Sequence, residues 1–228
     1  MTAAVVPALN EEPRIARTIR ALRAVGGISE VVAVDDGSTD ATAREAEAAG
    51  ARVVRLQRNA GKGAALTAGA GETHADVLLF IDADLEDTAA QASCLLAPVL
   101  CGEADMAIAR FPIVPGAGGG AGLVVRLARW GIRRATGRTM ISPLSGQRAL
   151  TRAALNRCLP LSEGFGVEVG LTVDALLAGL RVTEIATTMA HRVTGRRPAD
   201  IRHRARQFVA VCRALWQRRA ALLRDRTR

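Results

Sequence analysis

Short runs of aliphatic and β-branched residues alternate with longer alanine-rich segments through the first half of the chain. The short runs have the length of strands, and the segments between them favour helices. Such alternation is typical of a mostly parallel sheet covered by helices on both faces, so we expect an α/β fold. The pattern predicts strands at 3–7, 30–35, 52–56, 76–82 and 105–109, and helices at 13–25, 41–49, 62–73 and 88–100.

The pattern changes after Arg110, where the proline- and glycine-rich segment FPIVPGAGGGAG leads into an amphipathic, arginine-rich segment at 123–134. Beyond it we expect a strand at 144–150, a helix at 167–180, a strand at 181–189 and a basic helix from Ala199 to about Arg224. A chain of 228 residues suits one large domain. We expect its two halves at 1–110 and 111–197, with the basic helix at 198–228.

Charge divides the chain unequally. Residues 1–110 carry 10 basic and 16 acidic side chains, whereas residues 111–228 carry 21 basic and 6 acidic ones. The first half therefore suits metal binding, and the second should attract an anionic substrate or a lipid headgroup. A solvated basic face is the structural alternative.

The C-terminal helix is both basic and amphipathic, with nine arginines and one aspartate in the final 28 residues. Such a helix can pack on the domain, form a homodimer, or lie peripherally on an anionic membrane. We favour packing or dimerisation because the apolar stripe is modest. The stripe consists of Phe208, Val209, Val211, Cys212, Leu215, Trp216, Leu222 and Leu223.

Several classes of protein fit the sequence poorly. We find no leader pattern and no apolar run long enough to cross a bilayer, so we expect a cytoplasmic protein. The four scattered cysteines lack the spacing of zinc sites or redox dithiols. Aromatic residues make up 3% of the chain and tyrosine is absent, which argues against nucleic-acid binding by base stacking.

The clearest chemical motif is VLLFIDADLED, an apolar strand that ends in Asp82, Ala83 and Asp84. Ligands of open α/β sheets bind at the carboxyl ends of strands. If the strand geometry persists, the two carboxylates point the same way, and the small Ala83 leaves room between them. They would suit Mg²⁺ or Mn²⁺, which can stabilise a leaving diphosphate. A solvated turn in which Asp84 caps the next segment is the alternative.

Two further motifs follow predicted strands. VVAVDDGSTD carries Asp35 and Asp36, which can accept hydrogen bonds from a nucleobase or ribose, or can simply form a tight turn. In PALNEE, Glu11 can hold a ribose and the backbone of Pro7 and Ala8 can line the base. Asn10 is equally well explained as a helix cap.

The segment RNAGKGAAL contains Lys62, the single lysine of the chain. Its glycines allow close approach of a ligand, and the helix N-terminus that follows favours anions. The spacing is not that of a Walker loop. A loose dinucleotide fingerprint at Gly116, Gly118 and Ala121 comes after the fifth strand, and no acidic residue follows it at the required distance, so we discard NAD binding.

Taken together, PALNEE, VDDGSTD, NAGKGAAL and the Asp82-Ala83-Asp84 strand end resemble, in order and spacing, the nucleotide-sugar half of glycosyltransferase family 2 and its GT-A relatives. The second half resembles the glucosyl-3-phosphoglycerate synthases through LSGQRALTRAAL, GFGVEVGLTVDALLAGL and MAHR. The first half also resembles dolichol-phosphate mannosyltransferases. The resemblance implies a GT-A fold and transfer of a sugar, with glucose favoured, from a UDP-sugar to an anionic acceptor such as phosphoglycerate or a polyprenyl phosphate.

The resemblance also implies roles for individual residues. It places Asp84 and His191 on the metal, Asp82 on the donor or the metal, and Glu168 against sugar hydroxyls or as a general base. A helix N-terminal acid is the alternative for Glu168, and an ordinary histidine for His191. The remaining residues would bind the uridine, the phosphates or the sugar: Pro7, Ala8, Asn10, Glu11, Asp36, Lys62, Phe165, Gly166 and Val167.

Two departures from the phosphoglycerate enzymes weaken the case for phosphoglycerate as the acceptor. The segment 120–123 lacks the arginine and threonine of their acceptor loop, and Val193 replaces an expected asparagine. The rival functions are a sugar-phosphate nucleotidyltransferase, whose N-terminal glycine-rich loop is missing, and a basic nucleic-acid-binding protein.

Overall fold

The structure is a computed structural model of the chain and describes residues 1–111, 122–189 and 198–223. Of residues 198–204 and 221 it describes only the backbone. The segments 112–121 and 190–197 therefore lie outside the description, and the expected metal ligand His191 falls within the second of them.

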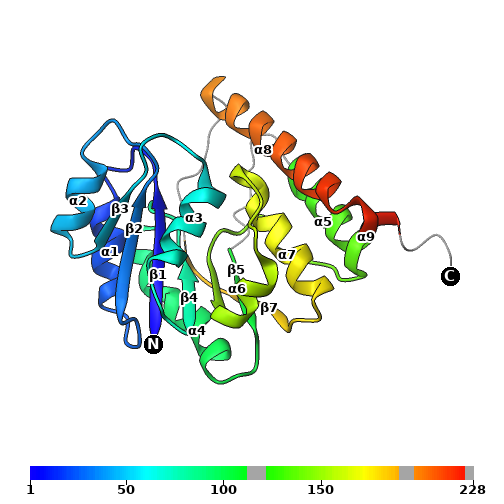
Figure 1. Cartoon of the computed structure of the whole chain (residues 1–228), viewed down its shortest axis with the longest axis horizontal. Helices are drawn as coiled ribbons and strands as arrows, with labels where there is room; N and C mark the ends of the chain where they lie inside the picture. The colour runs from blue at the N-terminus through cyan, green and yellow to red at the C-terminus, as the bar shows by residue number, and fades with distance from the viewer. Residues whose placement is uncertain (112–121, 190–197, 224–228) are drawn as a thin grey trace.

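A seven-stranded sheet forms the centre of the molecule (Figure 1). Its strand order is β3-β2-β1-β4-β6-β5-β7, and β6 alone runs antiparallel to its neighbours. The mostly parallel sheet predicted from the sequence is thus confirmed. The strands are β1 (Thr2–Ala8), β2 (Glu30–Asp35), β3 (Arg52–Arg55), β4 (Val77–Phe80), β5 (Met106–Arg110), β6 (Arg148–Thr151) and β7 (Val182–Ala186).

Helices cover both faces of the sheet, and each face has its own apolar core. One core contains Ile15 and Ile19 of α1 with Leu95 of α4. The other contains Leu66 of α3, Ile132 of α5 and Leu215 of α8. The helices are α1 (Ile15–Arg23), α2 (Thr42–Ala48), α3 (Lys62–Gly71), η1 (Glu86–Gln91), α4 (Ala92–Leu100), α5 (Leu123–Thr136), α6 (Arg152–Cys158), η2 (Gly164–Gly166), α7 (Val167–Leu177), α8 (Pro198–Gln217) and α9 (Arg219–Leu223).

The structure differs from the predicted elements mainly around β4 and β6. Strand β4 ends at Phe80, two residues before the expected end, and β6 begins at Arg148 rather than at residue 144. Helix α6 was not predicted, because it follows β6 directly and no turn residues separate the two elements. It is capped by Thr151, whose Oγ1 accepts a hydrogen bond of 3.0 Å from the amide of Ala154.

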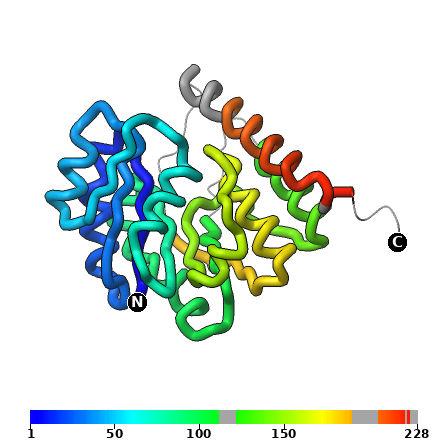
Figure 2. The backbone as a smooth tube through the Cα atoms, viewed as in Figure 1, coloured from blue at the N-terminus to red at the C-terminus, as the bar shows by residue number. Residues whose placement is uncertain are grey.

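The C-terminal helix packs along one face on the domain. Val211, Ala214 and Leu215 are buried there, and Arg218 donates hydrogen bonds to Asp174 (2.6 Å) and to Ser162 (2.9 Å). The tube in Figure 2 shows this helix running along the second half of the chain, away from α1 and α2. None of the described helices is long and apolar enough to span a membrane. All four cysteines are free thiols.

Candidate active site

The turn after β4 carries the two aspartates singled out in the sequence. Because β4 ends at Phe80, Asp82 and Asp84 lie beyond the strand, and the expected continuation of strand geometry is wrong. The side chain of Ala83 is 4% exposed and belongs to the apolar core, so it does not leave a gap for a ligand between them. The two carboxylates are held by a turn, each partly exposed.

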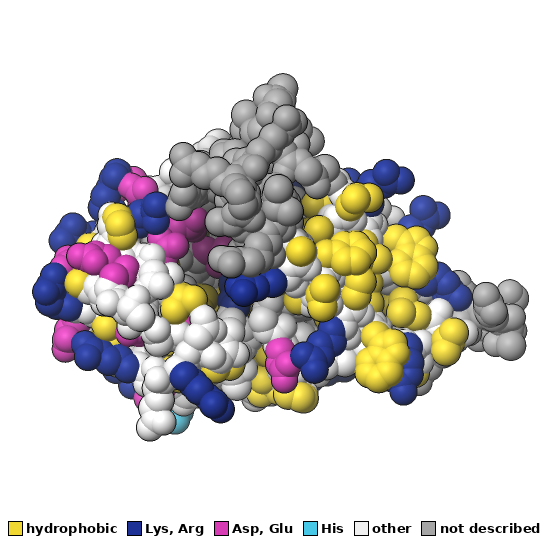
Figure 3. All heavy atoms as spheres, turned by 90° about the horizontal axis from the view of Figure 1, so that it is seen from above, with side chains coloured by type: hydrophobic (Ala, Val, Ile, Leu, Met, Phe, Trp, Pro, Cys, Tyr) yellow, Lys and Arg dark blue, Asp and Glu magenta, His cyan; other side chains and the backbone are white. Residues whose placement is uncertain are grey.

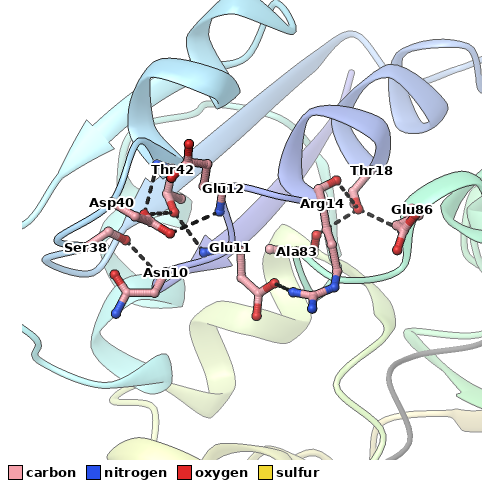
Figure 4. Close-up of polar contacts among 10 residues, drawn as sticks. All are labelled: Asn10, Glu11, Glu12, Arg14, Thr18, Ser38, Asp40, Thr42, Ala83 and Glu86. Carbon is pink, nitrogen blue, oxygen red and sulfur yellow. Dashed lines mark hydrogen bonds and ion pairs between the residues drawn. The ribbon is translucent and has the colours of Figure 1, made fainter.

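Thr18 of α1 fixes this turn from beneath. The hydroxyl donates a hydrogen bond of 2.8 Å to the carbonyl oxygen of Ala83, and it accepts one of 2.8 Å from the amide of Glu86 (Figure 4). Thr18 is fully buried. A single buried hydroxyl therefore satisfies backbone groups on both sides of Asp84, where an unpaired polar group would be costly.

Lys62 forms the centre of an ion cluster with Asp82 and Glu168. Its Nζ lies 2.5 Å from Oδ1 of Asp82 and 2.8 Å from Oε1 of Glu168. The three residues come from the start of α3, the turn after β4 and the start of α7, so segments far apart in the sequence converge here. The cluster brings together three residues that the sequence analysis had singled out separately.

Gly146 and Gln147, just before β6, complete the cluster. A side chain at Gly146 would place its Cβ 2.4 Å from Nζ of Lys62, so glycine leaves the space that the ammonium group occupies. Gln147 holds Asp82 at two points: its Nε2 donates to Oδ2 over 2.9 Å, and its Oε1 accepts from the amide of Asp82 over 3.0 Å. The orientation of the Asp82 carboxylate is thus fixed on both oxygens.

The pKa values of two cationic side chains in this region, Lys62 and Arg148, shift in opposite directions. Burial by itself would lower the pKa of Lys62, but the contacting carboxylates of Asp82 and Glu168 outweigh it and raise the pKa above its ordinary value. Arg148 of β6 is 1% exposed, and burial lowers the pKa of its guanidinium to about 10, although Glu168, Glu184 and Asp82 oppose the shift. Both cations stay charged at neutral pH.

Arg148 lies beneath the cluster, where a small cavity is lined by Lys62, Gly146, Glu168 and Arg148 itself. Its Nε donates to the carbonyl oxygen of Ser145 (2.9 Å) and its Nη1 to Oγ1 of Thr172 (2.9 Å), while Nη2 has no partner. No role for Arg148 was predicted from the sequence. With Lys62, it supplies two positive charges near two carboxylates, which leaves the buried part of the site electrically balanced.

The two aspartates at the end of β2 hold neighbouring loops in place by accepting hydrogen bonds from backbone amides. Asp36 is 5% exposed, and its carboxylate accepts hydrogen bonds from the amides of Ala60 (2.7 Å) and Gly61 (2.9 Å), immediately before Lys62. Asp35 accepts from the amide of Ser38 (2.9 Å). Asp36 therefore joins β2 to the lysine loop, and Asp35 makes the tight turn that was the alternative interpretation.

The PALNEE segment is tied to the loop after β2. Asn10 has φ of 55°, and its Oδ1 accepts a hydrogen bond from the amide of Thr39 (2.9 Å), so it is not a helix cap. Glu11 forms an ion pair of 2.7 Å with Arg14, and its amide donates to Oγ1 of Thr42 (Figure 4). Pro7 and Ala8 are the last two residues of β1, and Ala8 is buried.

The GFGVEVG segment faces three different surroundings. Gly166 packs against α8, where an added Cβ would lie 2.7 Å from the carbonyl oxygen of Ala210. Val167 is 1% exposed and lies in the core beside the small cavity, so these two residues do not present side chains to a sugar in the open site. Phe165 is partly exposed, and Glu168 joins the ion cluster.

The carboxylates at the turn after β4 are of the kind that bind a divalent metal. Within the described parts of the chain no three acidic, histidine or cysteine side chains cluster as a metal site, and His191 lies outside them. Mg²⁺, however, typically takes one or two protein carboxylates together with phosphate oxygens of the substrate. Asp84 and Asp82 at the carboxyl edge of the sheet offer that set of hard oxygen ligands.

Thr18, Gly146, Gln147 and Arg148 are the residues that sequence reasoning missed. The last three lie in LSGQRALTRAAL, where Gln147 directly precedes β6 and Arg148 begins it. That arrangement was a usable signal, because a polar pair entering a buried strand must find partners there. Thr18 gave no signal, since it occupies an ordinary position in an amphipathic helix.

Comparisons with known proteins agree with this geometry. The family model described as glycosyl transferase family 2 matches residues 3–158. A glucosyl-3-phosphoglycerate synthase of Mycolicibacterium paratuberculosis is 35% identical over 193 residues, which cover 75% of this chain and 58% of the relative. The chain thus spans about three-fifths of the length of such curated relatives.

A crystal structure and a second relative extend the comparison. Glucosyl-3-phosphoglycerate synthase of Mycobacterium tuberculosis, in complex with Mn²⁺, UDP-glucose and phosphoglyceric acid, superposes with a TM-score of 0.76 at 32% identity, covering 96% of this chain and 79% of that chain. An undecaprenyl-phosphate 4-deoxy-4-formamido-L-arabinose transferase of Pseudomonas paraeruginosa is 36% identical over 97 residues, which cover 38% of this chain and 29% of the relative. The GT-A fold expected from the sequence is confirmed, and the chain belongs to glycosyl transferase family 2.

Proposed function

We propose that this protein is a metal-dependent glycosyltransferase that moves a sugar, with glucose favoured, from a UDP-sugar to an anionic acceptor. The observation that carries the proposal is the Lys62–Asp82–Glu168 ion cluster beside Asp84 at the carboxyl edge of the sheet. Family membership gives the reaction class, and the mycobacterial complex with Mn²⁺ and UDP-glucose supports the choice of donor and metal.

The loops after β1 and β2 would receive the uridine. A hydrogen bond from the amide of Thr39 to Oδ1 of Asn10 joins the two loops and fixes their spacing before a nucleotide binds. In this proposal the backbone of Pro7 and Ala8 lines the base, and Glu11 binds the ribose. Asp36 contributes mainly by holding the amides that precede Lys62, since both of its carboxylate oxygens accept hydrogen bonds from them.

The diphosphate would lie between Lys62 and Asp84. Asp84 would hold the divalent metal, with His191 as the second expected ligand, and the metal would supply charge neutralisation for the leaving diphosphate. Lys62 opens α3, so its ammonium group and the helix N-terminus both favour an anion at this position. Asp82, held on both oxygens by Lys62 and Gln147, fixes the ammonium group rather than a ligand in the described state.

Glu168 would orient hydroxyl groups of the sugar. It is 6% exposed, and its Oε1 lies 2.8 Å from Nζ of Lys62, so this oxygen already has a partner. The pairing therefore favours orientation over the general-base role. Phe165, partly exposed beside it, would pack against the sugar or the acceptor.

The acceptor class follows from charge and from the relatives. The second half of the chain carries 21 basic and 6 acidic side chains, which favours an anion. Phosphoglyceric acid occupies the mycobacterial complex, and the name of the Pseudomonas relative gives undecaprenyl phosphate as its substrate. We propose a phosphorylated acceptor, either a small molecule or a polyprenyl phosphate. The cytoplasmic location, the homodimer and the peripheral membrane contact stay predictions.

A transfer assay tests the proposal. UDP release is measured from a panel of UDP-sugars with Mn²⁺ or Mg²⁺, with and without phosphoglycerate, glycerol 3-phosphate and a short polyprenyl phosphate. We expect metal-dependent release with one sugar, stimulated by a phosphorylated acceptor. Release that is independent of metal and acceptor, or no binding of any nucleotide-sugar, would refute the proposed function.

A further inference from the structure

Half of the large hydrophobic side chains that are strongly exposed in the described residues lie on three helices. They occupy α5, α8 and α9, and we call the surface that they form the helix face. Figure 3 shows these side chains gathered on one side of the view from above, with basic side chains around them. The exposed residues are Leu123 (67%), Trp130 (59%), Phe208 (42%), Val209 (65%), Trp216 (63%) and Leu223 (63%).

The helix face is continuous because α5 and α8 pack side by side. Gly131 of α5 lies directly against Leu215 of α8, where an added Cβ would come 2.4 Å from a methyl carbon of that leucine. Phe208 and Leu215 are seven residues apart, about two helical turns, and so share one side of α8. Trp216 of α8 and Trp130 of α5 are the sequence neighbours of Leu215 and Gly131, so each lies about 100° around its helix from the seam. The apolar side chains of both helices therefore border the same seam.

Arginines flank the seam, and the described acidic side chain that pairs with one of them is Glu163, 3.1 Å from Arg213. Residues 123–136 and 205–223 contain no aspartate or glutamate. On α5 the exposed arginines are Arg126, Arg129 and Arg133, and on α8 they include Arg206 and Arg213. Arg219 lies over the ring of Trp216 at 4.3 Å from its centroid. The helix face thus has an apolar middle and a positively charged border.

We propose that the helix face is a docking surface for a membrane that contains anionic phospholipids. Tryptophan and leucine enter the headgroup region of a bilayer readily, and arginines at the border bind lipid phosphates. A membrane of this kind complements both the apolar middle and the positive border. The surface lies on folded, packed helices, so little ordering is required when it binds.

The charge pattern disfavours a second copy of the chain as the occupant. A twofold dimer places the same patch of each subunit against the other. The arginine borders would then meet one another, with only Arg213 among the arginines named here paired to a carboxylate, Glu163, and like charges repel at close range. The apolar contact between two such patches would have to overcome that repulsion.

Helix α8, which carries part of the helix face on its exposed side, packs beside the active site with its other side. Gly166 packs directly on α8, and Glu168 of the ion cluster follows two residues later in the chain. Docking would therefore hold the proposed active site beside the bilayer surface, where a lipid-linked phosphate would be presented. The docking surface itself does not depend on the proposed reaction, and its test uses no activity.

Intrinsic fluorescence gives a selective probe, since Trp130 and Trp216 are the two tryptophans of the chain and tyrosine is absent. The intact protein is titrated with vesicles of phosphatidylcholine alone and with vesicles that also contain phosphatidylglycerol. We expect a blue shift of the emission with the anionic vesicles, weakened by added salt, and binding at least about tenfold weaker to phosphatidylcholine.

Variants locate the binding by vesicle co-sedimentation. We expect the double variants Trp130→Ser/Trp216→Ser and Arg126→Gln/Arg133→Gln each to bind anionic vesicles about tenfold more weakly, with unchanged circular dichroism. A matched control is Leu100→Ser/Arg44→Gln, which changes exposed residues on α4 and α2 and should bind like the wild type.

Three results would overturn the inference. The first is an emission spectrum that vesicles do not change. The second is equal binding by the helix-face variants and the wild type. The third is a dimer in light scattering that the tryptophan variants dissociate while vesicles have no effect, which would assign the helix face to a second copy.

Discussion

The loops after β1 and β2 are held by side chains that bind neighbouring backbone, whereas Lys62, Asp82 and Glu168 bind one another through their charges. In the loops, Asn10 accepts from an amide and Asp36 accepts from two. In the ion cluster, each carboxylate contacts the same ammonium group. Both regions were recognisable as polar motifs at strand ends, yet their physical roles differ.

The difference separates scaffolding from chemistry. A side chain that satisfies an amide of its own chain contributes mainly to stability and loop shape. Charged groups brought together in a partly buried site raise the electrostatic energy of the folded state unless they are paired, and such groups concentrate at functional sites. We therefore expect substitutions in the ion cluster to affect activity more than stability, and substitutions that free loop backbone to do the reverse.

The largest effect should follow Lys62→Met, which keeps the aliphatic stem and removes the charge. We expect kcat/KM to fall by at least about 100-fold, because a cation next to the diphosphate is lost. Asp82 and Glu168 would also face each other without their shared cation, so stability should fall more at neutral pH than at a pH where carboxylates are protonated. Kinetics and thermal unfolding at both pH values measure this.

Arg55→Met is the matched control for Lys62, since Arg55 is an exposed cation at the end of β3. It should change kcat/KM by less than about twofold. Equal losses in the two variants would mean that the general positive charge of the region, and not the ion cluster, supports activity.

Arg148→Met should shift the pH profile of kcat/KM. Arg148 is a buried positive charge near Glu168 and Asp82, and its loss makes a negative charge on these carboxylates less favourable, so the acidic limb should move to higher pH. At neutral pH we expect about a tenfold loss. Unfolding free energy should also fall, because Ser145 and Thr172 lose their hydrogen bonds to the guanidinium, and the relief of its costly burial offsets only part of that loss.

The neighbouring Arg152 provides the contrast. Its guanidinium donates to the carbonyl oxygens of Ala75, Ala70 and Thr73, away from the ion cluster. Arg152→Met should lower the unfolding free energy and leave the acidic limb in place. A pH shift of equal size in both variants would contradict a specific electrostatic role for Arg148.

Asp36→Ala should mainly lower the free energy of unfolding. It removes the acceptor of two buried amides, and we expect the unfolding free energy to fall by about 2 kcal/mol. Because those amides precede Lys62, kcat/KM should fall by about tenfold. Asp36→Asn keeps one oxygen acceptor and should recover part of both losses; a variant with full stability and no activity would instead place Asp36 on the nucleotide.

Thr18→Val should have the smallest effect. It leaves the Ala83 carbonyl and the Glu86 amide without their shared hydroxyl, at a cost of about 1–2 kcal/mol in unfolding free energy. We expect kcat/KM to change by less than about fivefold, since Thr18 acts only through the turn. Thr18→Ser restores the hydroxyl and should restore stability, as measured by chemical denaturation.

The sequence predicted the sheet well where alternation was regular and less well where it was not. The first four strands and their helices were anticipated, because each apolar run is followed by a polar turn. The antiparallel placement of β6 between β4 and β5 depends on long-range pairing that a local pattern does not encode. Helix α6 was missed because it follows β6 without a turn.

For the site, motif recognition identified the carboxylates and Lys62 but not how they are connected. The pairing of Lys62 with Glu168 joins residues 106 positions apart and became visible only once α3 and α7 met. Val167 and Gly166 were expected on the donor side, yet α7 is buried on nearly all sides, which places Val167 in the core, and the close approach of α8 requires a glycine at Gly166. His191 lies outside the described residues, so its role stays a prediction.

The most direct test of the donor site is calorimetric titration of UDP into the protein with and without Mn²⁺, for the wild type, Asp84→Asn and Asp87→Asn. Asp87 is the matched control, because its exposed carboxylate lies on the same segment and pairs with Arg17. We predict that Mn²⁺ tightens UDP binding at least about tenfold in the wild type and in Asp87→Asn, and not in Asp84→Asn. Undiminished tightening by Mn²⁺ in a folded Asp84→Asn variant would contradict the assignment of the metal to Asp84.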